Sequence, residues 1–417
     1  MENSAEKCFV GVDWGDKKHA VCVVDAEGRD IAAFCVSHTA EGITVLVETL
    51  QKYAPVGGVA VETRRNLMVQ KLWEAGFAVF PVNPKVSQAW REGWSAAAGK
   101  TDASDARVLA DGLRQHHQRM HALCLDDERT RELAMLCADE NRLVGERTAM
   151  VNRLRATLKE YHPAALDWFD DWTAPTAWDF VLAFPQPDTL RHASRKRLYS
   201  FLKTHCIGLS PKWQERVEGN ARTALWPNDK ATVAAKSRMA VSLAKQLRTL
   251  EASLREYRKR IEELFDEHPD SDIFSSLPGA GPKLAPQLLS HFGSRRDNYK
   301  DARALQQLSG TVPVTVRSGR ICHHRFRWEC SKEFRNTMHQ FALHSIRYCA
   351  WAHAFYDEAK ERGQSNALAL RNLAAKWIKI IFRMWLEHIP YDDSRYLASL
   401  KKRNSPLIQL LNEGAKP

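Results

Sequence analysis

Two aspartates, Asp102 and Asp105, stand three positions apart in the stretch GKTDASDARVLADGLR, where a helix is predicted to begin. Side chains at i and i+3 lie on the same face of a helix, so the two carboxylates repel each other unless a counter-charge is near. Carboxylate oxygens are also the ligands that Mg²⁺ prefers. The pair therefore predicts either a solvated helix start or part of a divalent-cation site.

Two further acids follow predicted strands. Asp13 ends the first strand, in VGVDWG, and Glu62 ends a later one, in VAVE. A carboxylate at the end of a buried strand is costly to bury without a partner. Taken alone, Asp13 also fits the start of a turn, and Asp102 fits a favourable charge at a helix N-terminus. Together the four acids predict a site for two Mg²⁺ ions, which can clamp the attacking and leaving oxygens of a phosphodiester.

The elements that must position these acids form a mixed α/β sheet. Short apolar runs predict strands, and amphipathic stretches between them predict helices. A threonine before the last helix has the chemistry of an N-cap. Strands are predicted at 7–13, 19–25, 30–36, 56–62 and 77–83, and helices at 40–53, at 65–76 and at 102–114, which Thr101 caps.

A heptad pattern follows in the middle of the chain, which is expected to be long, helical and of coiled-coil type. Its apolar residues alternate four and three apart, as in an a/d seam. An antiparallel pairing with a helical stretch at 128–161 is as consistent with the pattern as an intermolecular coiled coil is. The seam residues are Leu243, Leu247, Leu250, Leu254, Tyr257, Ile261 and Leu264.

These patterns divide the chain into a series of regions. We expect a metal-binding α/β domain first, then the helical region with a Trp-rich and mostly helical insertion, then a mainly α domain and a loose tail. The boundaries are 1–125, 126–268 with the insertion at 163–230, 269–395 and 396–417.

The composition of the chain limits the classes of partner that it is expected to bind. The 417 residues carry a formal net charge of +11, which favours a polyanion such as nucleic acid, although a basic surface alone would look the same. The most apolar stretch, 377–386, is short and contains Lys379 and Arg383, so no membrane partner is expected. Nine scattered cysteines and no visible signal peptide predict reduced thiols and a cytoplasmic protein that associates with the nucleoid when it is bound to DNA.

Two glycines open the C-terminal part, in LPGAGPKLAPQLLSHFG. Gly279 and Gly281 precede a predicted helix, and Lys283 lies in its first turn. Such a turn is typical of a helix-hairpin-helix, in which backbone amides approach a phosphate. An ordinary loop into a helix has the same pattern.

The segment CHHRFRWEC allows two interpretations. Zinc sites usually pair their ligands in two halves, and no second Cys/His cluster lies near Cys322, His323, His324 and Cys330. A strand or loop that faces nucleic acid is favoured, with Arg325 and Arg327 on phosphates and the neighbouring aromatic residues on bases. Burial of Phe326 and Trp328 in the core is equally consistent with the segment.

The N-terminal motifs carry a family resemblance. The segments FVGVDWGDKKHAVCVVDAEG, VAVETR, VFPVNPKVSQAWREG and KTDASDARVLA resemble the DEDD transposases of the "one-ten" insertion-sequence family. The resemblance implies a RuvC-like domain with the ribonuclease-H fold. Its four acids fall on Asp13, Glu62, Asp102 and Asp105, which would be both catalytic and metal-binding residues.

The C-terminal motifs are similar to the same family's transposase domain. LPGAGPKLAPQLLSHFG matches its Pro-Gly-x-Gly segment, and ALQQLSGTVPVTVRSGR matches the region of its catalytic serine, which falls on Ser318. From the residues alone, Ser318 is a loop serine between Arg317 and Arg320, without a base in the neighbouring sequence to activate it. The stretch after the serine departs from the family, because Glu333-Phe334 and His339-Gln340 replace the expected glycine and arginines.

The resemblance implies a Mg²⁺-dependent recombinase that acts on element ends and target DNA through a serine–DNA covalent intermediate. It also implies a non-coding guide RNA encoded by the element, and a homodimer that forms tetramers on DNA. Two other functions fit the residues: a metal-dependent Holliday-junction-type nuclease that uses the four acids alone, and a non-catalytic nucleic-acid-binding protein.

Overall fold

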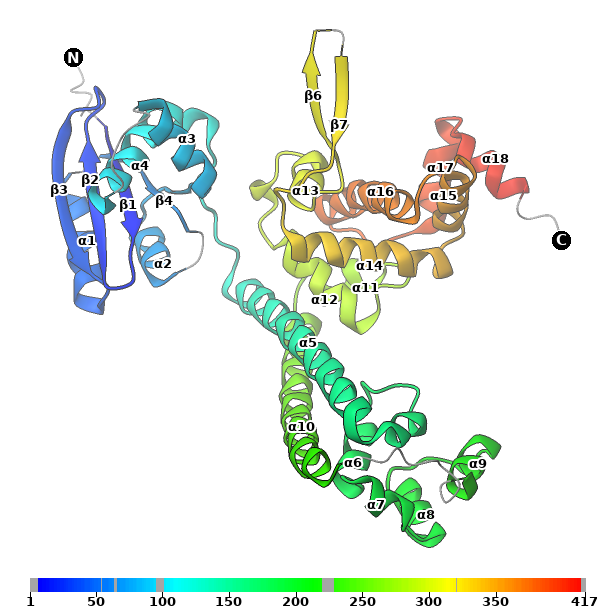
Figure 1. Ribbon diagram of the computed structural model, residues 1–417. Coiled ribbons are helices and arrows are strands. Elements are labelled where there is room, and N and C mark those ends of the chain that lie inside the picture. The colour runs from blue at the N-terminus through cyan, green and yellow to red at the C-terminus, as the bar shows by residue number, and fades with distance from the viewer. Residues whose placement is uncertain are drawn as a thin grey trace. The chain divides into compact units, whose positions relative to one another are not determined.

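The computed structural model describes residues 7–53, 55–63, 66–94, 101–219, 229–319 and 321–413. The chain divides into two compact units, Met1–Leu125 and Asp126–Pro417, which we call the N-terminal unit and the C-terminal unit. Figure 1 shows the elements of each.

The N-terminal unit is built on a five-stranded mixed sheet. The strand order is β3-β2-β1-β4-β5, with β1, β2 and β3 antiparallel to one another and with β4 and β5 parallel to β1. The strands are β1 (Cys8–Trp14), β2 (Lys18–Val24), β3 (Asp30–Ser37), β4 (Val56–Val61) and β5 (Val79–Pro81). Three strands followed by alternating helix and strand were predicted, and the structure confirms this mixed sheet.

Helices cover both faces of this sheet (Figure 1). The apolar faces of α1 and α2 pack on one side, against Val10 and Val12 of β1. The apolar face of α4 packs on the other side, against Phe9 of β1 and Ala60 of β4. Because β1 and β4 are buried on both faces, their sequences are apolar runs rather than alternating patterns. The helices are α1 (Ala40–Lys52), α2 (Leu67–Glu74), α3 (Pro84–Trp94) and α4 (Asp102–His116).

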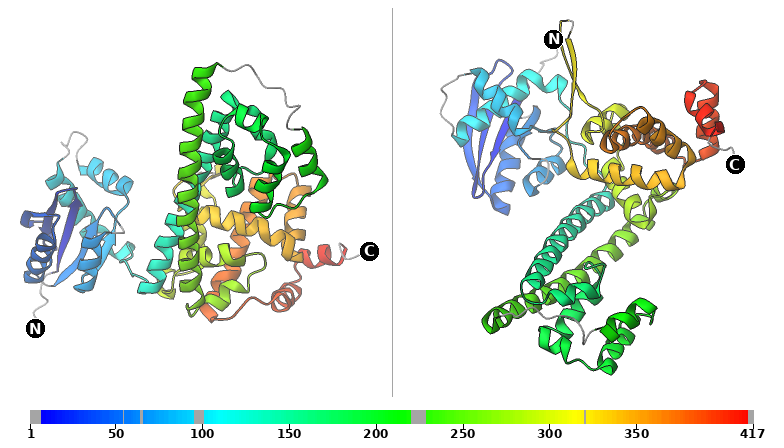
Figure 2. Two further views of the ribbon diagram at one scale, coloured as in Figure 1. Left: turned by 90° about the horizontal axis from the view of Figure 1, so that it is seen from below. Right: turned by 45° about the vertical axis from the view of Figure 1, so that its right-hand side comes forward.

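Two long helices, α5 (Glu128–Tyr161) and α10 (Lys230–Asp266), begin the C-terminal unit. They lie side by side as an antiparallel hairpin (Figures 1 and 2). The ion pairs between them show the antiparallel direction. Arg147 of α5 pairs with Glu251 of α10, whereas Glu132, which lies earlier in α5, pairs with Arg260, which lies later in α10. The apolar seam of α10 is therefore buried within this chain, which decides between the two pairings that the heptad pattern allowed.

A helical lobe lies at the far end of this hairpin (Figure 2). Its core is aromatic, with Trp168, Trp178 and Phe180 buried against Leu154 of α5 and Leu247 of α10. The helices of the lobe are α6 (Pro175–Ala183), α7 (Pro187–Arg191), α8 (Arg195–Thr204) and α9 (Pro211–Gly219). Residues 220–228 of the Trp-rich stretch lie outside the described residues.

The rest of the C-terminal unit is mainly helical around one large core, which contains Trp351, Trp377 and Trp385. A two-stranded hairpin, β6–β7, projects from it (Figure 1). The elements are α11 (Ser271–Ser275), α12 (Gly281–Phe292), α13 (Ala302–Leu308), β6 (Val314–Ser318), β7 (Ile321–Arg325), α14 (Lys332–Tyr348), α15 (Ala350–Glu361), α16 (Asn366–Glu387), α17 (Asp393–Lys402) and α18 (Pro406–Glu413).

The final segment differs from the expected loose tail. Residues 396–413 contain most of α17 and all of α18, and Leu400 and Leu407 are buried in the large core. Burial of these two side chains against the neighbouring helices explains the order that composition alone did not indicate. No described helix is both long enough and apolar enough to cross a bilayer.

The residue before α5 and the loop after α12 meet at one carboxylate. Asp126 accepts hydrogen bonds from the backbone amides of Ser294, at 2.8 Å, and Arg295, at 2.9 Å. We call this contact the Asp126 clasp. It joins the residue just before α5 to the loop that follows α12, so the chain returns to its starting point after 168 residues.

Candidate active site

The register of the sheet places the first two acids beside each other. Val12 of β1 pairs with Val61 of the parallel strand β4, so Asp13 and Glu62 are the next residues at the same edge. Side chains alternate between the faces of a strand. Since Phe9 and Ala60 face α4, Asp13 and Glu62 belong to that face as well. Both are half-buried.

Helix α4 brings the other two acids to this edge. Thr101 caps the helix, as predicted, and also forms a capping box with Ser104. Asp102 and Asp105 lie in the first turn. Asp102 is exposed, whereas Asp105 is 6% exposed.

The direction of α4 follows from two glycines of the sheet. A Cβ at Gly11 of β1 would lie 2.0 Å from the Ala106 carbonyl oxygen, so the helix backbone rests directly on the strand. A Cβ at Gly58, near the start of β4, would lie 3.2 Å from the side chain of Leu113. The helix therefore runs opposite to β1, and its N-terminal turn lies toward the strand end that carries Asp13.

Helix α3 contacts two of the four acids. The Ser87 hydroxyl donates a hydrogen bond to Glu62, and Arg91 Nη2 lies 2.5 Å from Asp105 Oδ1. Ser87 and Arg91 are four residues apart, so they share one face of the helix. Sequence reasoning missed both residues. The i, i+4 spacing of a hydroxyl and a cation in NPKVSQAWREG was the available signal.

The donor chemistry of these acids fits Mg²⁺, which takes hard oxygen ligands. Within the ranges that the structure describes, however, no group of three or more His, Cys, Asp or Glu residues is close enough to hold a metal. The positive charge beside Asp105 comes from Arg91 instead. A metal bound here would compete with this guanidinium for Asp105.

The predicted nucleophile lies in the other unit. Ser318 is the last residue of β6, at the tip of the projecting hairpin, where it pairs with Ile321. Both Ser318 and Arg317 are exposed, and Gly319 adopts a positive φ of 56° in the turn. In the described part of the chain, no base forms a hydrogen bond with the Ser318 hydroxyl. Arg320, predicted to contact nucleic acid, lies outside the described residues.

The two glycines of the turn into α12 adopt a backbone conformation that favours glycine. Gly279 has φ +82° and Gly281 has φ +57°, both in the left-handed region that favours glycine. A Cβ at Gly279 would meet the backbone of His344, whereas Gly281 faces open space at the start of α12. Lys283, the third residue of α12, is exposed. The turn can therefore present backbone and charge to a phosphate.

The CHHRFRWEC segment forms β7 and the loop after it. Arg325 is exposed at the end of β7, and Arg327 is half-buried with its Nε 3.4 Å from the Val312 carbonyl oxygen. In the part of the chain that the structure describes, its cysteines and histidines belong to no group of three that could hold a metal. The nucleic-acid interpretation of this segment stays a prediction.

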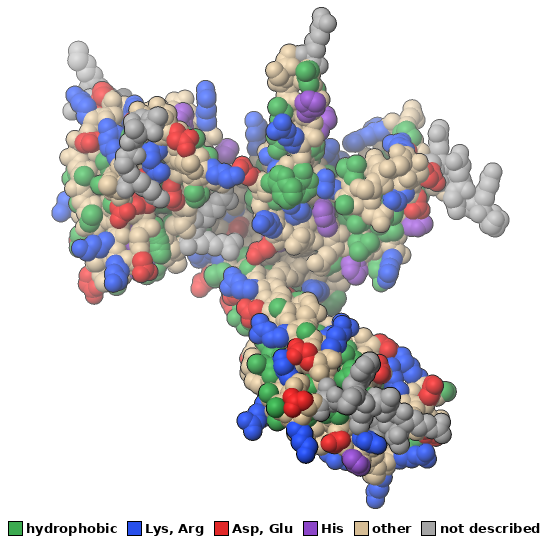
Figure 3. Space-filling model, in the orientation of Figure 1, with side chains coloured by type: hydrophobic (Ala, Val, Ile, Leu, Met, Phe, Trp, Pro, Cys, Tyr) green, Lys and Arg blue, Asp and Glu red, His purple; other side chains and the backbone are tan. Residues whose placement is uncertain are grey.

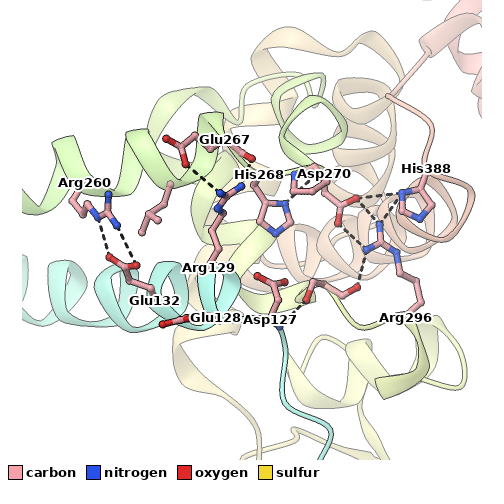
Figure 4. Close-up of a pocket in the computed structure, with 13 residues that line it drawn as sticks. Asp127, Glu128, Arg129, Glu132, Arg260, Glu267, His268, Asp270, Arg296 and His388 are labelled. Atoms are coloured by element: carbon pink, nitrogen blue, oxygen red, sulfur yellow. Dashed lines mark hydrogen bonds and ion pairs between the residues drawn. The ribbon is translucent and has the colours of Figure 1, made fainter.

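A charged cavity of about 600 Å³ lies where α5, α10 and the segments after α12 and α16 meet (Figure 4). Each arginine that lines it pairs with a carboxylate, so the cavity has no spare guanidinium for an anion. The pairs are Arg129–Glu267, Arg260–Glu132 and Arg296–Asp270. We interpret these ion pairs as contacts that hold the neighbouring segments together and stabilise the fold.

Comparison with known families decides what kind of protein carries this arrangement. Residues 10–163 match a transposase family of the IS110 DEDD type, and residues 271–357 match the transposase family IS116/IS110/IS902. The chain belongs to the IS116/IS110/IS902 family of transposases. The predicted resemblance is thereby confirmed, and the mixed sheet is the ribonuclease-H-like domain of this family.

Relatives of this transposase extend over most of its length. The chain is 28% identical over 401 residues to the "Mini-circle putative transposase for IS117" of Streptomyces coelicolor, which covers 94% of this chain and 97% of the relative. It is 25% identical over 397 residues to the insertion element IS900 42 kDa protein of Mycobacterium paratuberculosis, over 93% and 98% of the two chains. A transposase processes DNA, so the chain is a DNA-binding protein.

Proposed function

We propose that this transposase catalyses metal-dependent DNA cleavage and strand exchange for an insertion sequence, with Ser318 as its nucleophile. One observation carries the proposal: the β1–β4 register and the direction of α4 bring four acids toward one edge of the sheet. Carboxylates gathered at one edge repel one another, and their oxygens are the ligands that Mg²⁺ prefers, so this arrangement favours a metal.

The acids divide into two pairs in this proposal. Asp13 and Glu62 would hold the cation from the strand ends, and Asp102 and Asp105 would hold it from the first turn of α4. Two bound Mg²⁺ ions would supply charge stabilisation at the phosphate. Ser87 positions Glu62 through its hydrogen bond, and Arg91 neutralises Asp105 until a cation takes its place.

The covalent step is an exchange of phosphate esters. The Ser318 oxygen would attack a DNA phosphorus, forming a serine–phosphate ester while the bond to the leaving sugar oxygen breaks. The serine proton is lost, and the leaving oxygen takes up a proton, so no oxidant or further reactant is needed. A later attack by a DNA hydroxyl on this ester would release Ser318 and join the exchanged strands.

The partners beyond DNA are part of the same proposal. The net charge of +11 supports a polyanionic assembly, and the family resemblance implies a guide RNA encoded by the element. The resemblance also implies dimers that form tetramers on DNA. Since the α10 seam is buried inside the chain, any contact between copies would have to use another surface.

The test compares Ser318→Ala and Asp13→Asn with the wild-type protein, with Mg²⁺, element-end DNA and RNA transcribed from the element's flanks. Wild-type protein should form a protein–DNA adduct that survives denaturing electrophoresis. Ser318→Ala should lose the adduct while it keeps DNA binding, and Asp13→Asn should lose at least about 100-fold in rate, since one metal ligand is gone.

Two outcomes would contradict the proposal. If Ser318→Ala still cuts DNA at the wild-type rate, water is the nucleophile and the protein acts as a nuclease. If neither variant changes any DNA product, the four acids and the serine are not catalytic. Omission of the RNA tests the guide, because the adduct should then no longer form at a defined site.

A further inference from the structure

Two cationic side chains and a histidine meet at the foot of the β6–β7 hairpin. Arg335 and His339 lie one turn apart on α14, and Arg371 comes from α16. Both guanidinium groups lie over the ring of Phe326, which follows β7, with Cζ 4.5 Å from the ring centroid for Arg335 and 4.4 Å for Arg371. We call Arg335, His339 and Arg371 the arginine cluster.

No carboxylate balances this cluster. Among the described residues, neither Arg335 nor Arg371 forms an ion pair with an acid, unlike the arginines of the charged cavity. Burial lowers the pKa of His339, and the neighbouring charges of Arg371 and Arg335 lower it further. Like charges that converge without a counter-ion repel one another, so an anion at this place would stabilise the fold.

Unused donors remain in the cluster. Arg335 Nη2 donates to the Arg327 carbonyl oxygen at 2.6 Å, but Arg335 Nε is buried without a hydrogen-bond partner. Arg371 Nε and His339 Nε2 are buried and unpartnered as well. Arg335 and Arg371 are only half-buried, so a phosphate could accept from the parts of their guanidinium groups that solvent reaches, and guanidinium groups match its geometry.

An exposed aromatic ring stands beside the cluster. Trp328 is 75% exposed, and its ring centroid lies 4.7 Å from that of Phe326 in an edge-to-face contact. On the face shown in Figure 3, Lys and Arg side chains lie around the foot of the hairpin. An exposed tryptophan next to cations is the arrangement that stacks an unpaired base and holds its phosphate.

We propose that the foot of the hairpin binds an unpaired strand of nucleic acid, with a phosphate at Arg371 and Arg335 and a base on Trp328. This proposal takes one point from the proposed function, which is that the bound polymer is nucleic acid. Ser318 lies at the tip of the same hairpin, four residues or about 13 Å along β6 from Val314 at its foot. A strand held at the foot would thus pass close to the nucleophile.

Binding of short labelled strands to the full chain tests the proposal without any reaction. The probes are fluorescein-labelled dT15 and U15, which separate DNA from RNA, and a duplex of the same length, measured by fluorescence anisotropy over a range of salt. Arg371→Gln should weaken single-strand binding about tenfold and lower the salt slope by about 0.7. Trp328→Ala should weaken it about tenfold as well, through lost stacking.

A matched variant controls for net charge. Arg255→Gln removes an exposed arginine of α10 that forms no ion pair among the described residues, and it should leave single-strand affinity unchanged. Thermal unfolding checks that each variant is folded. Because Trp328 is largely exposed, Trp328→Ala should fold even if Arg371→Gln does not.

Photo-cross-linking gives a direct readout. A strand with a single 5-iododeoxyuridine should cross-link to the peptide that contains Trp328. Wild-type affinity in both variants, or equal losses for the duplex and the single strands, would overturn the proposal. If the wild-type protein catalyses no strand exchange but both variants still bind single strands more weakly, the proposed function is contradicted and the binding site is supported.

Discussion

Arg91 holds Asp105 by an ion pair in which both side chains are largely buried, at 19% and 8% exposure. Its removal should act in opposite directions on stability and on metal binding. Arg91→Ala leaves an uncompensated carboxylate, which should cost about 3 kcal/mol of unfolding free energy. The same change removes a positive charge beside the proposed cation, so Mn²⁺ should bind more tightly and stabilise the variant more than the wild type.

Thermal unfolding with and without Mn²⁺, together with titration calorimetry, measures both effects. Arg29→Ala is the matched control, because Arg29 pairs with Asp25 at the surface of the same unit and is 71% exposed. It should change neither the unfolding free energy nor Mn²⁺ binding measurably, because an exposed ion pair contributes little to stability. Weaker Mn²⁺ binding in Arg91→Ala would show that Arg91 supports the cation and does not compete with it.

At the scale of elements, the contact between β1 and α4 depends on one glycine. In Gly11→Ala the new Cβ would overlap the Ala106 carbonyl oxygen, so α4 must move away from the strand. Overpacking of this kind costs about 1–3 kcal/mol, and the shift would also carry Asp102 and Asp105 away from the strand ends. We expect a lower unfolding midpoint and loss of metal-dependent cleavage.

Gly93→Ala provides the comparison. Gly93 lies in α3, and a Cβ there meets nothing within 4 Å. Alanine has the higher helix propensity, so this variant should be as stable as the wild type or more so by up to about 1 kcal/mol. If Gly11→Ala unfolds and cleaves like Gly93→Ala, the close contact between strand and helix does not position the acids.

The sequence predicted the sheet and the four acids because local signals marked both. Apolar runs located the strands that end beside Asp13 and Glu62, and the Thr101 cap located the helix that begins at Asp102. The i, i+4 spacing of Ser87 and Arg91 did not identify the partner of Asp105, because Arg91 lies on a largely polar helix and only tertiary packing selects its contact.

The C-terminal unit shows the same limit. Arg335 and Arg371 are 36 positions apart and meet only because α14 packs against α16. The heptad seam predicted a buried stripe on α10 correctly, but its period is the same for an internal partner and for a second chain. The order of the last segment depended on a core that no local pattern describes.

At the scale of the whole molecule, acid should weaken the C-terminal unit in two steps. His162 is 1% exposed, and burial lowers its pKa to about 4, with the Phe184 backbone opposing part of the shift. The unfolded state therefore takes up this proton first, and stability present above about pH 6.5 is lost as the pH falls toward 4. The shift corresponds to about 3 kcal/mol.

The second step involves Asp127 at the start of α5. Burial raises its pKa, but hydrogen bonds from Ser294 and Thr130 outweigh burial and lower it to about 2. Its contribution is present above about pH 3.8 and is lost as the pH falls toward 2. Urea unfolding at pH 7, 5 and 4 should show the first loss in the wild type and a smaller one in His162→Gln. Equal pH dependence in the two proteins would contradict the assignment to His162.

The Asp126 clasp has a consequence for how this family can change in length. Because Asp126 and Ser294 are hydrogen-bonded to each other, the chain between residues 126 and 294 forms a closed loop. The entropy of closing such a loop grows only with the logarithm of its length, by about 0.6 kcal/mol for each doubling. A helical turn, a new lobe or a foreign domain could therefore be spliced into the far end of the α5–α10 hairpin at little cost to the closure. That end is the natural place to attach a reporter or a second binding module.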